Sequence, residues 1–489
     1  MCGGFVLWRR NLDSNSVQPI QFYEKREIIV PRSVKGKFRN FKTSILLLAY
    51  AVYFGLPWLP WTRNGQISQA IMFDLIDRRF DIFDVVIYPQ NVFWLALLLF
   101  IAATFLFFAT TLIGRAFCGY FCFQTIWTDL FIWIERVVQG ERTARLRLQK
   151  QPWHLEKITK IGLTHALWLA FSFWTGMTFV LYFGYAPDLL HRFFLGNAAS
   201  AAYITVLGLT VSTYVAAGFM REQICAYVCP YGRFQSVMYD ASTLAVAYDV
   251  RRGEGLTGRT PARGDLKSRD ERLKQGHGDC IDCGLCVQVC PAGIDIREGL
   301  QYRCISCGLC IDACNSVMGS VGYPQGLIRY DSEANIASTV PVKPHLDWKR
   351  LKVVGYLVAL IVMTGLLVYD VEHRSDFEVG VRQVRQPLFV YLSDGKIRDR
   401  YQIRLQNDTE HDVTYRISAE GLPPGALDLG SMDQVLVHGD RSVIVLANVA
   451  MSAAQAEKYT KFSFVVHPVN NPKDRAVQMA SFNSEKVRQ

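Results

Sequence analysis

The cysteine pattern constrains this chain more than any other feature of its sequence. Eight of the 13 cysteines fall in one short segment, in two halves with matching intervals: Cys280, Cys283, Cys286, Cys290, Cys304, Cys307, Cys310 and Cys314. Each half reads Cys-x-x-Cys-x-x-Cys-x-x-x-Cys, the run that holds 4Fe-4S clusters in bacterial ferredoxins. The sequence therefore predicts a two-cluster ferredoxin module over residues 279–330.

In such modules the fourth cysteine of each half ligates the cluster that the first three cysteines of the other half hold. The eight thiols therefore divide into two ligand sets. We expect the first set to be Cys280, Cys283, Cys286 and Cys314, and the second to be Cys304, Cys307, Cys310 and Cys290. Gly284 and Gly308 would let backbone amides approach the inorganic sulfides. Zinc ribbons and disulfides are the alternatives, but zinc sites seldom share a ligand in this way, and disulfides do not suit a reducing compartment.

Long apolar stretches indicate a membrane protein. The chain is 50% hydrophobic and 13% aromatic, which is high for a soluble protein. Five stretches of roughly 17 to 22 residues are long enough to cross a bilayer as helices. They are residues 41–61, 92–113, 161–182, 198–219 and 353–369. The net charge of +10 comes from basic residues beside these stretches, so we expect membrane lipid and no nucleic acid as a partner.

Basic residues also predict the sidedness. Lysine and arginine gather in residues 1–40 and 114–157, whereas the loops at residues 62–91 and 183–197 contain few. By the positive-inside rule, the N-terminal segment 1–40 and the ferredoxin module are cytoplasmic in a bacterial inner membrane. Four helices would lie within residues 41–250 and the fifth at 351–370. Residues 251–278 are rich in glycine and charge, and we expect a flexible linker there.

Two further cysteine pairs lie at the predicted cytoplasmic membrane edge. They read Cys118-Gly-Tyr-Phe-Cys122 and Cys225-Ala-Tyr-Val-Cys229. On a helix, residues four apart share one face, so each pair would offer two thiolates. Soft thiolates favour Cu(I), a further cluster or zinc, and they can also cycle through a disulfide. The ferredoxin run already supplies eight thiolates, so we hypothesise that these four form a copper site. Structural cysteines are the alternative.

Three weaker patterns also suggest local structure. Residues 123–138 have helical amphipathic spacing and predict a helix along the inner membrane surface. His165 is an isolated imidazole in the third predicted span, for which we expect a hydrogen-bonded helix contact rather than a quinone or metal contact. Four carboxylates three and four apart suggest one face of an interfacial helix, with a weak cation site as the alternative. These are Asp74, Asp77, Asp81 and Asp84.

Residues 371–489 contain neither cysteine nor a catalytic cluster and resemble a β-domain. Short alternating or β-branched segments separated by turn signals predict strands at 388–392, 401–405, 413–417, 442–446, 461–466 and 476–480. An immunoglobulin-like β-sandwich in the periplasm is the expected fold. The whole chain is thus predicted to be a multidomain membrane protein with a five-helix transmembrane bundle, an inserted ferredoxin module and a C-terminal sandwich.

This combination resembles the family of cytochrome c oxidase accessory proteins called CcoG, FixG or RdxA. The resemblance covers nearly the whole chain. Its marks are Cys118-Gly-Tyr-Phe-Cys122 with Gln124-Thr125 and Trp127-Thr128-Asp129, Cys225 to Cys229 with Pro230-Tyr231 and Arg233-Phe234-Gln235, Cys290-Pro291 before Gly293-Ile294-Asp295-Ile296-Arg297, and Ile311-Asp312-Ala313-Cys314. Phe123 departs from the pattern, since we expect proline there.

The resemblance implies a membrane-bound cupric reductase that converts Cu(II) to Cu(I) during assembly of the cbb-type oxidase. It implies two 4Fe-4S clusters, copper as substrate or bound ion, a cytoplasmic electron donor, and oxidase subunits or copper chaperones as partners. Two alternatives remain at this stage. One is a quinol-dehydrogenase-type electron-transfer subunit, and the other is a non-catalytic copper-binding assembly scaffold.

The predicted topology can be tested with reporter fusions. A reporter placed after residue 489 should be active only outside the cytoplasm, and one placed after residue 258 only inside, because five crossings separate the N-terminus from the C-terminal domain. Alkaline phosphatase and a fluorescent protein, each fused at both sites, provide the paired measurement. Activity of both fusions on one side would mean that a span has been miscounted.

Overall fold

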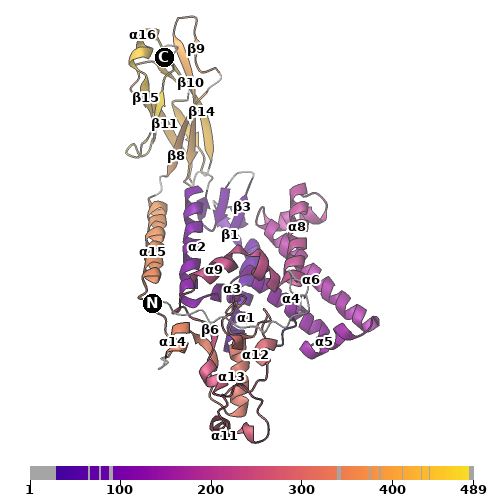
Figure 1. The fold of residues 1–489 in the computed structure, drawn as a ribbon. Coiled ribbons are helices and arrows are strands. Elements are labelled where there is room, and N and C mark those ends of the chain that lie inside the picture. Colours follow the sequence, from indigo (N-terminus) through magenta and orange to yellow (C-terminus); the bar gives the residue numbers. More distant parts are fainter. Residues whose placement is uncertain are drawn as a thin grey trace, which may run out of the picture. The chain divides into compact units, whose positions relative to one another are not determined.

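The computed structural model describes residues 29–63, 66–75, 79–87, 92–338, 343–373, 376–384, 387–409, 411–430, 432–439 and 441–483. The chain forms two compact units. One consists of residues 1–61 and 67–360, and the other of residues 62–66 and 361–489. The first unit contains the helical bundle and the ferredoxin module, and the second contains the β-sandwich (Figure 1).

Long helices form the bundle of the first unit (Figure 1). They are α1 (Lys37–Gly55), α2 (Val92–Ile113), α4 (Phe123–Gln139), α5 (Arg142–Lys150), α6 (Leu155–Leu181), α7 (Ala186–Phe194) and α8 (Ser200–Thr213), which continues as a π-helix at Tyr214–Met220. The surface of α2 is apolar, with Leu98, Leu99 and Phe100 exposed. A helix with such a surface requires lipid rather than water around it.

In the part of the chain that the structure describes, five helices are long and apolar enough to cross a membrane, which agrees with the predicted number. They are Lys37–Trp58, Val92–Ile113, Ala116–Gln139, Ser200–Met220 and α15 (Leu351–Glu372). Four match predicted spans. The third predicted span, at residues 161–182, lies in α6, which is not among the five. The segment that contains α4 is among them instead.

Both helices bury polar side chains. Helix α6 is 27 residues long and buries Thr164, Ser172 and Thr175. Helix α4 is amphipathic as predicted, but it buries Asp129 and Glu135. The expected helix contact of His165 is confirmed, since its Nδ1 lies 3.0 Å from the hydroxyl of Tyr214.

The aspartate-rich loop is a sheet, so the expected helix was wrong. Strands β3 (Ile71–Asp74), β4 (Arg79–Ile82) and β5 (Val85–Ile87) form an antiparallel sheet, and β1 (Pro60–Arg63) pairs with β2 (Gln66–Gln69). Alternating aromatic and β-branched residues favour strands here, and the three-and-four spacing of the aspartates is incidental. Asp81 is buried, and Asp77 lies outside the described residues.

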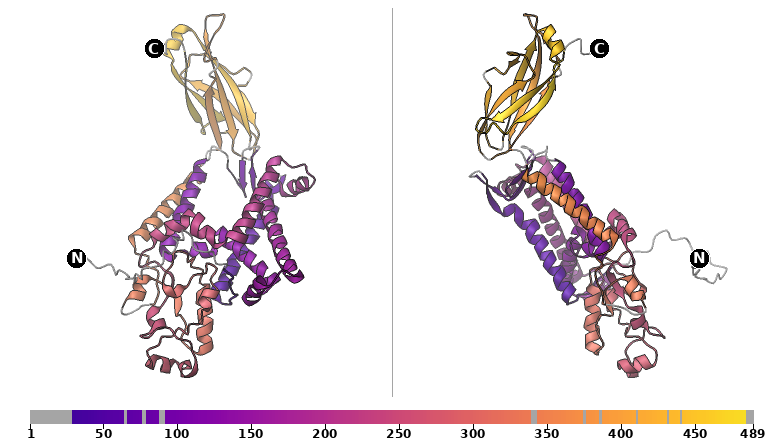
Figure 2. Two further views of the ribbon diagram at one scale, coloured as in Figure 1. Left: turned by 45° about the vertical axis from the view of Figure 1, so that its right-hand side comes forward. Right: turned by 90° about the vertical axis from the view of Figure 1, so that its left-hand side faces the viewer.

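The ferredoxin module lies at one end of the bundle in all three views (Figures 1 and 2). Its elements are α12 (Leu285–Gln288), α13 (Leu309–Val321) and α14 (Glu333–Ala337), and strand β6 (Ala245–Tyr248) pairs antiparallel with β7 (Ile328–Asp331). Pairing of β6 with β7 joins the end of the bundle to the end of the module.

The predicted flexible linker at 251–278 is instead packed. It contains α10 (Val250–Glu254) and α11 (Arg269–Lys274). Arg272 is only 1% exposed and donates to the carbonyls of Thr260, Gly278 and Cys280. The high content of glycine and charged residues suggested a flexible segment. Composition cannot show that a single arginine hydrogen-bonds several loop carbonyls at once and so orders the segment.

The second unit is a sandwich of two antiparallel sheets, which confirms the predicted immunoglobulin-like fold. One sheet has the order β12-β14-β10-β8 with β9 on β10, and the other has the order β13-β11-β15-β16. The strands are β8 (Phe377–Gln383), β9 (Val390–Tyr391), β10 (Ile397–Asn407), β11 (Val413–Glu420), β12 (Leu427–Asp428), β13 (Gln434–Val437), β14 (Ser442–Met451), β15 (Lys461–Pro468) and β16 (Ala476–Ser481), with α16 (Ala453–Lys458) before β15. Strands β8, β12 and β13 were not predicted.

A carboxylate is buried among the core residues of this sandwich. Asp399 lies on β10, and its Oδ2 accepts from Gln383, from the Tyr401 hydroxyl and from the backbone N–H of Asn483. Its Oδ1 has no hydrogen-bond partner. Burial raises the pKa of Asp399 to about 6, against the lowering effect of the Asn483 N–H. Folding therefore favours the protonated acid, and this contribution to stability is lost as the pH rises through about 6.

Asp399→Asn should make the sandwich more stable than wild type at pH 8 and should have little effect at pH 4. The predicted gain is roughly 3 kcal/mol, since the amide is neutral at both values. Hydrogen exchange of β10 in the full-length protein, compared between variant and wild type at each pH, measures it. The exposed Asp433→Asn is the matched control and should show no such pH dependence. An equal effect of Asp399→Asn at both pH values would contradict the assignment.

Candidate metal centres

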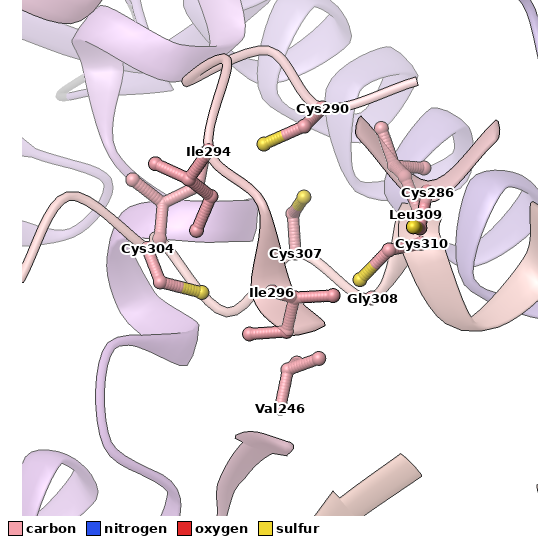
Figure 3. Close-up of a pocket in the computed structure, with 11 residues that line it drawn as sticks. Val246, Cys286, Cys290, Ile294, Ile296, Cys304, Cys307, Gly308, Leu309 and Cys310 are labelled. Atoms are coloured by element: carbon pink, nitrogen blue, oxygen red, sulfur yellow. The ribbon is translucent and has the colours of Figure 1, made fainter. Parts of the chain in front are cut away.

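Two cavities in the ferredoxin module are lined by cysteines. One is lined by Cys280, Cys283, Cys286 and Cys314. The other is lined by Cys290, Cys304, Cys307 and Cys310, with Cys286 at its margin. Figure 3 shows the sulfurs of Cys290, Cys304, Cys307 and Cys310 directed toward a common space. The structure thus brings together the four thiols of each predicted set, including the fourth cysteine that comes from the other half of the run.

The two loops that carry these thiols have nearly the same sequence and the same backbone shape. Residues 280–286 read Cys-Ile-Asp-Cys-Gly-Leu-Cys, and residues 304–310 differ only by Ser306 in place of Asp282. Asp282 and Ser306 both have φ of +50°, and Gly284 and Gly308 follow with φ of +64° and +71°. Left-handed residues turn successive backbone N–H groups toward a concave side, which is the usual way a backbone surrounds an anionic group.

Burial keeps these thiols neutral unless a nearby cation compensates for the charge of the thiolate. Burial raises the pKa of Cys286 and Cys304 to about 11, and that of Cys290 and Cys314 to about 12. Metal ligation requires thiolates, so positively charged iron must offset the cost of burying them. Among the described residues, no three His, Cys, Asp or Glu side chains are arranged around a single ion. Three cysteines at two-residue gaps with a fourth from the other half are the ligand pattern of a cubane, which spreads its ligands over four irons.

The membrane-edge cysteine pairs do not lie along one helical face, as the spacing predicted. Cys118 lies in the short helix α3 (Ala116–Tyr120), whereas Cys122 has an extended backbone and precedes α4. Cys225 lies in a π-helical turn (Ile224–Val228), and Cys229 precedes α9 (Pro230–Met238) in the same extended conformation. A sharp change of chain direction at the second cysteine of each pair is the reason for the difference.

The two turns nevertheless repeat each other in detail. The N–H of Cys122 donates to Phe117 over 3.0 Å, and the N–H of Cys229 donates to Ile224 over 2.7 Å. Each bond joins the second cysteine to the residue before the first. Proline at the first position of α9 favours such a helix start. Phe123 takes that position in α4, and the turn forms there without proline.

The turns bring the two pairs together. Cys118 lies close enough to Cys122 and Cys225 for their charges to interact, and Cys225 interacts in the same way with Cys122 and Cys229. All four side chains are partly buried. Among the described residues, no three of these side chains are placed to bind one ion. Binding of a single copper ion by three or more of them therefore requires their side chains to move.

The membrane-edge loop packs directly on the second cluster loop. A Cβ atom at Gly119 would lie 2.6 Å from the carbonyl oxygen of Ile305 and 3.0 Å from the Cα of Cys307. The neighbouring Tyr120, which is 5% exposed, donates its hydroxyl proton to the carbonyl of Cys307 over 2.9 Å. Only glycine permits this approach. The second ligand set therefore lies beside the membrane-edge thiols.

Buried charges fix the ferredoxin to the bundle, and our sequence reasoning missed them. Asp312 of α13 accepts from the backbone N–H groups of Phe38 and Arg39 at the start of α1. Asp129 of α4 pairs with Arg39 over 2.9 Å and with Lys42 over 3.5 Å. A carboxylate at a helix N-terminus is favourable. Asp129 and Asp312 were noted only as parts of motifs, although charged residues next to cysteines or within apolar helices are themselves a signal.

This fold and these thiol sets define a membrane-associated iron-sulfur electron-transfer protein. Comparison with protein-family models supports that class. Residues 94–139 match a 4Fe-4S binding domain, residues 220–333 match a 4Fe-4S dicluster domain, and residues 367–485 match the IG-like fold at the C-terminal of FixG. Similarity to whole proteins places the chain more narrowly, and it belongs to the FixG and Rdx family.

Three relatives show the extent of this similarity. Protein RdxB of Cereibacter sphaeroides is 42% identical over 91% of this chain and 94% of its own length. Protein RdxA of the same organism is 42% identical over 82% of this chain and 83% of its own length. The nitrogen fixation protein FixG of Rhizobium meliloti is 36% identical over 94% of this chain and 93% of its own length.

Gly119→Val should separate the membrane-edge loop from the second cluster loop, because the added side chain has no space. We expect the iron content to fall from about eight atoms toward about four, with the first cluster retained. Iron analysis and EPR spectra of the reduced protein measure this. Gly162→Val is the control, because nothing lies within 4 Å of a Cβ atom at that position. Full iron content in Gly119→Val would show that the contact does not support the cluster.

Proposed function

We propose that the chain is a membrane-bound cupric reductase that reduces Cu(II) to Cu(I) for assembly of the cbb-type cytochrome oxidase. One observation carries the proposal. Four soft thiols, Cys118, Cys122, Cys225 and Cys229, lie together beside the second set of cluster ligands, with Gly119 and Tyr120 in contact with the loop of that set. This arrangement supports transfer of electrons from iron-sulfur ligands to a metal held by thiolates.

Two sets of cysteines would hold the cofactors. Cys280, Cys283, Cys286 and Cys314 form the first set, and Cys304, Cys307, Cys310 and Cys290 form the second. When bound, 4Fe-4S clusters supply low-potential one-electron transfer. In the first set Cys283 is exposed to solvent, whereas in the second Cys304 and Cys307 are buried next to the membrane-edge loop. A cytoplasmic donor would therefore approach at Cys283.

The copper step needs one electron and no proton. Cu(II) accepts one electron from the reduced protein and becomes Cu(I), which soft thiolate ligands stabilise over Cu(II). The four membrane-edge cysteines are only partly buried, which leaves a route for copper to reach them. Their side chains are the proposed catalytic ligands, and the ion is substrate rather than resident cofactor.

The proposed orientation follows from the basic residues. We infer that the N-terminal segment and the ferredoxin module are cytoplasmic and that the sandwich is periplasmic, since lysine and arginine gather on the side of the cysteines. A donor in the cytoplasm then supplies the electrons. Oxidase subunits or copper chaperones are the proposed partners, and the sandwich offers a periplasmic domain for contacting them.

An anaerobic assay tests the proposal. The purified protein is reduced with dithionite, freed of excess reductant and mixed with Cu(II), and Cu(I) is measured with a selective chelator. Two one-electron clusters should yield about two Cu(I) per protein. Serine at Cys118, Cys122, Cys225 and Cys229 removes the soft donors but keeps the size, and it should slow Cu(I) formation at least about tenfold while the iron-sulfur spectrum is unchanged.

Three outcomes separate this proposal from its alternatives. The control Cys2→Ser should leave Cu(I) formation unchanged, because it lies outside both cysteine pairs. Loss of a 4Fe-4S signal in the quadruple serine variant would mean that these thiols hold a cluster. Binding of copper without its reduction would favour an assembly scaffold. Rapid reduction of the clusters by a quinol analogue would instead favour a quinol dehydrogenase subunit.

A further inference from the structure

A buried arginine at the junction between the ferredoxin and the membrane-edge loops pairs with no carboxylate of the described residues. Arg115, which is 4% exposed, lies between α2 and α3. Its guanidinium donates to the side-chain oxygen of Gln235 over 2.9 Å and to the backbone carbonyls of Tyr302 and Gly232. All three acceptors are neutral, and Arg115 takes part in no ion pair with the described residues.

Two other arginines of the bundle, one buried and one partly buried, show the contrast. Arg145, which is 3% exposed, and Arg221 both pair with the carboxylate of Glu135. Arginine is almost never fully buried without an opposite charge, because hydrogen bonds to neutral groups offset only part of the cost of desolvation. Arg272 of the ferredoxin module is likewise buried and donates to neutral carbonyls, so burial alone does not require an anion. Arg115 differs in that the thiols of two proposed metal sites surround it.

The thiols around Arg115 can supply a negative charge. The Cys118 thiol donates to the same Gln235 oxygen over 3.3 Å, so the sulfur lies near the guanidinium. Tyr302 comes two residues before Cys304, and Gly232 comes three residues after Cys229. Arg115 is thus bound to helix α9, which follows the second membrane-edge pair, and to Tyr302, which lies just before the loop of the second cluster. In the chain it stands three residues before Cys118. Its charge acts on Cys118, Cys225 and Cys304.

We propose that Arg115 is the fixed cation that balances the metal-thiolate groups on both sides of this junction and favours their reduced states. With the same ligands, a reduced group carries one more negative charge than the oxidised group. A cation at a fixed distance in a partly buried site stabilises the reduced group more. Arg115 is a positioning residue and touches neither iron nor copper. The copper part of this inference rests on the proposed function, and the cluster part does not.

Redox potentials test the cluster part. Arg115→Met should lower one of the two cluster midpoint potentials, that of the cluster ligated by Cys304, and leave the other unchanged. EPR-monitored titration of the full-length protein measures both. Arg272→Met is the matched control, because Arg272 is also buried and donates to backbone carbonyls, among them that of Cys280 of the first set. Any shift in that variant should be confined to the other cluster.

Affinity for Cu(I) tests the copper part. Arg115→Met should weaken Cu(I) binding roughly tenfold or more in competition with a chromophoric chelator, as expected for loss of a unit charge from a partly buried site. Arg272→Met should bind Cu(I) as wild type does. If wild-type protein binds no Cu(I), the proposed function fails while the potentials still test the role of Arg115.

Arg115→Lys separates charge from hydrogen bonding. Lysine keeps the charge but loses the planar fork, so its potentials and Cu(I) affinity should stay near those of wild type. The proposal is overturned if Arg115→Lys behaves like Arg115→Met, or if Arg115→Met shifts neither potential or shifts both equally. Where Arg115→Met loses iron, Arg115→Gln replaces it. If Arg115→Met and Arg115→Gln lose iron while Arg115→Lys retains it, the result supports the need for a positive charge at this position. If Arg115→Lys loses iron too, the result contradicts the proposal.

Discussion

The first unit depends on compensation of buried charge where the ferredoxin meets the helices. A charge removed from water is tolerated only beside an opposite charge or aligned hydrogen-bond donors. Asp312 meets the N–H groups at the start of α1, and Asp129 meets Arg39 and Lys42. Asp312 is two residues from Cys314 on α13, so the contact that docks the module also positions a ligand of the first set.

A second constraint comes from the repeated turn. Both membrane-edge pairs place one cysteine in a helical turn and the other at the start of the next helix, with the same backbone hydrogen bond across them. The repeat brings four thiols near one another from two different parts of the chain. Gly119, between the cysteines of the first pair, then allows the second cluster loop to approach. Proximity of soft ligands and cluster ligands is therefore built into backbone geometry.

The two ligand sets differ in their exposure to solvent and in their distance from the membrane-edge loop. Each set has two buried cysteines, but Cys283 of the first set is exposed, whereas no cysteine of the second set is exposed and Cys307 lies in contact with the membrane-edge loop. Arg115 is bound to Gly232 and Gln235 of α9 and to Tyr302, two residues before the second cluster loop. Under the proposed function, an exposed ligand in the first set and a cation beside the second set would favour electron transfer toward the membrane edge, because a cation stabilises the reduced group nearest to it.

The sequence by itself determined the features that depend on local spacing. The doubled cysteine run indicated two crossed sets of thiols, apolar length indicated five crossing helices, and alternation indicated the sandwich. Tertiary structure decided what depends on distant partners. It made the aspartate segment a sheet, packed residues 251–278 around Arg272 and turned the chain at Cys122 and Cys229. Spacing along a chain reports periodicity, but burial and hydrogen-bond partners arise only when remote segments meet.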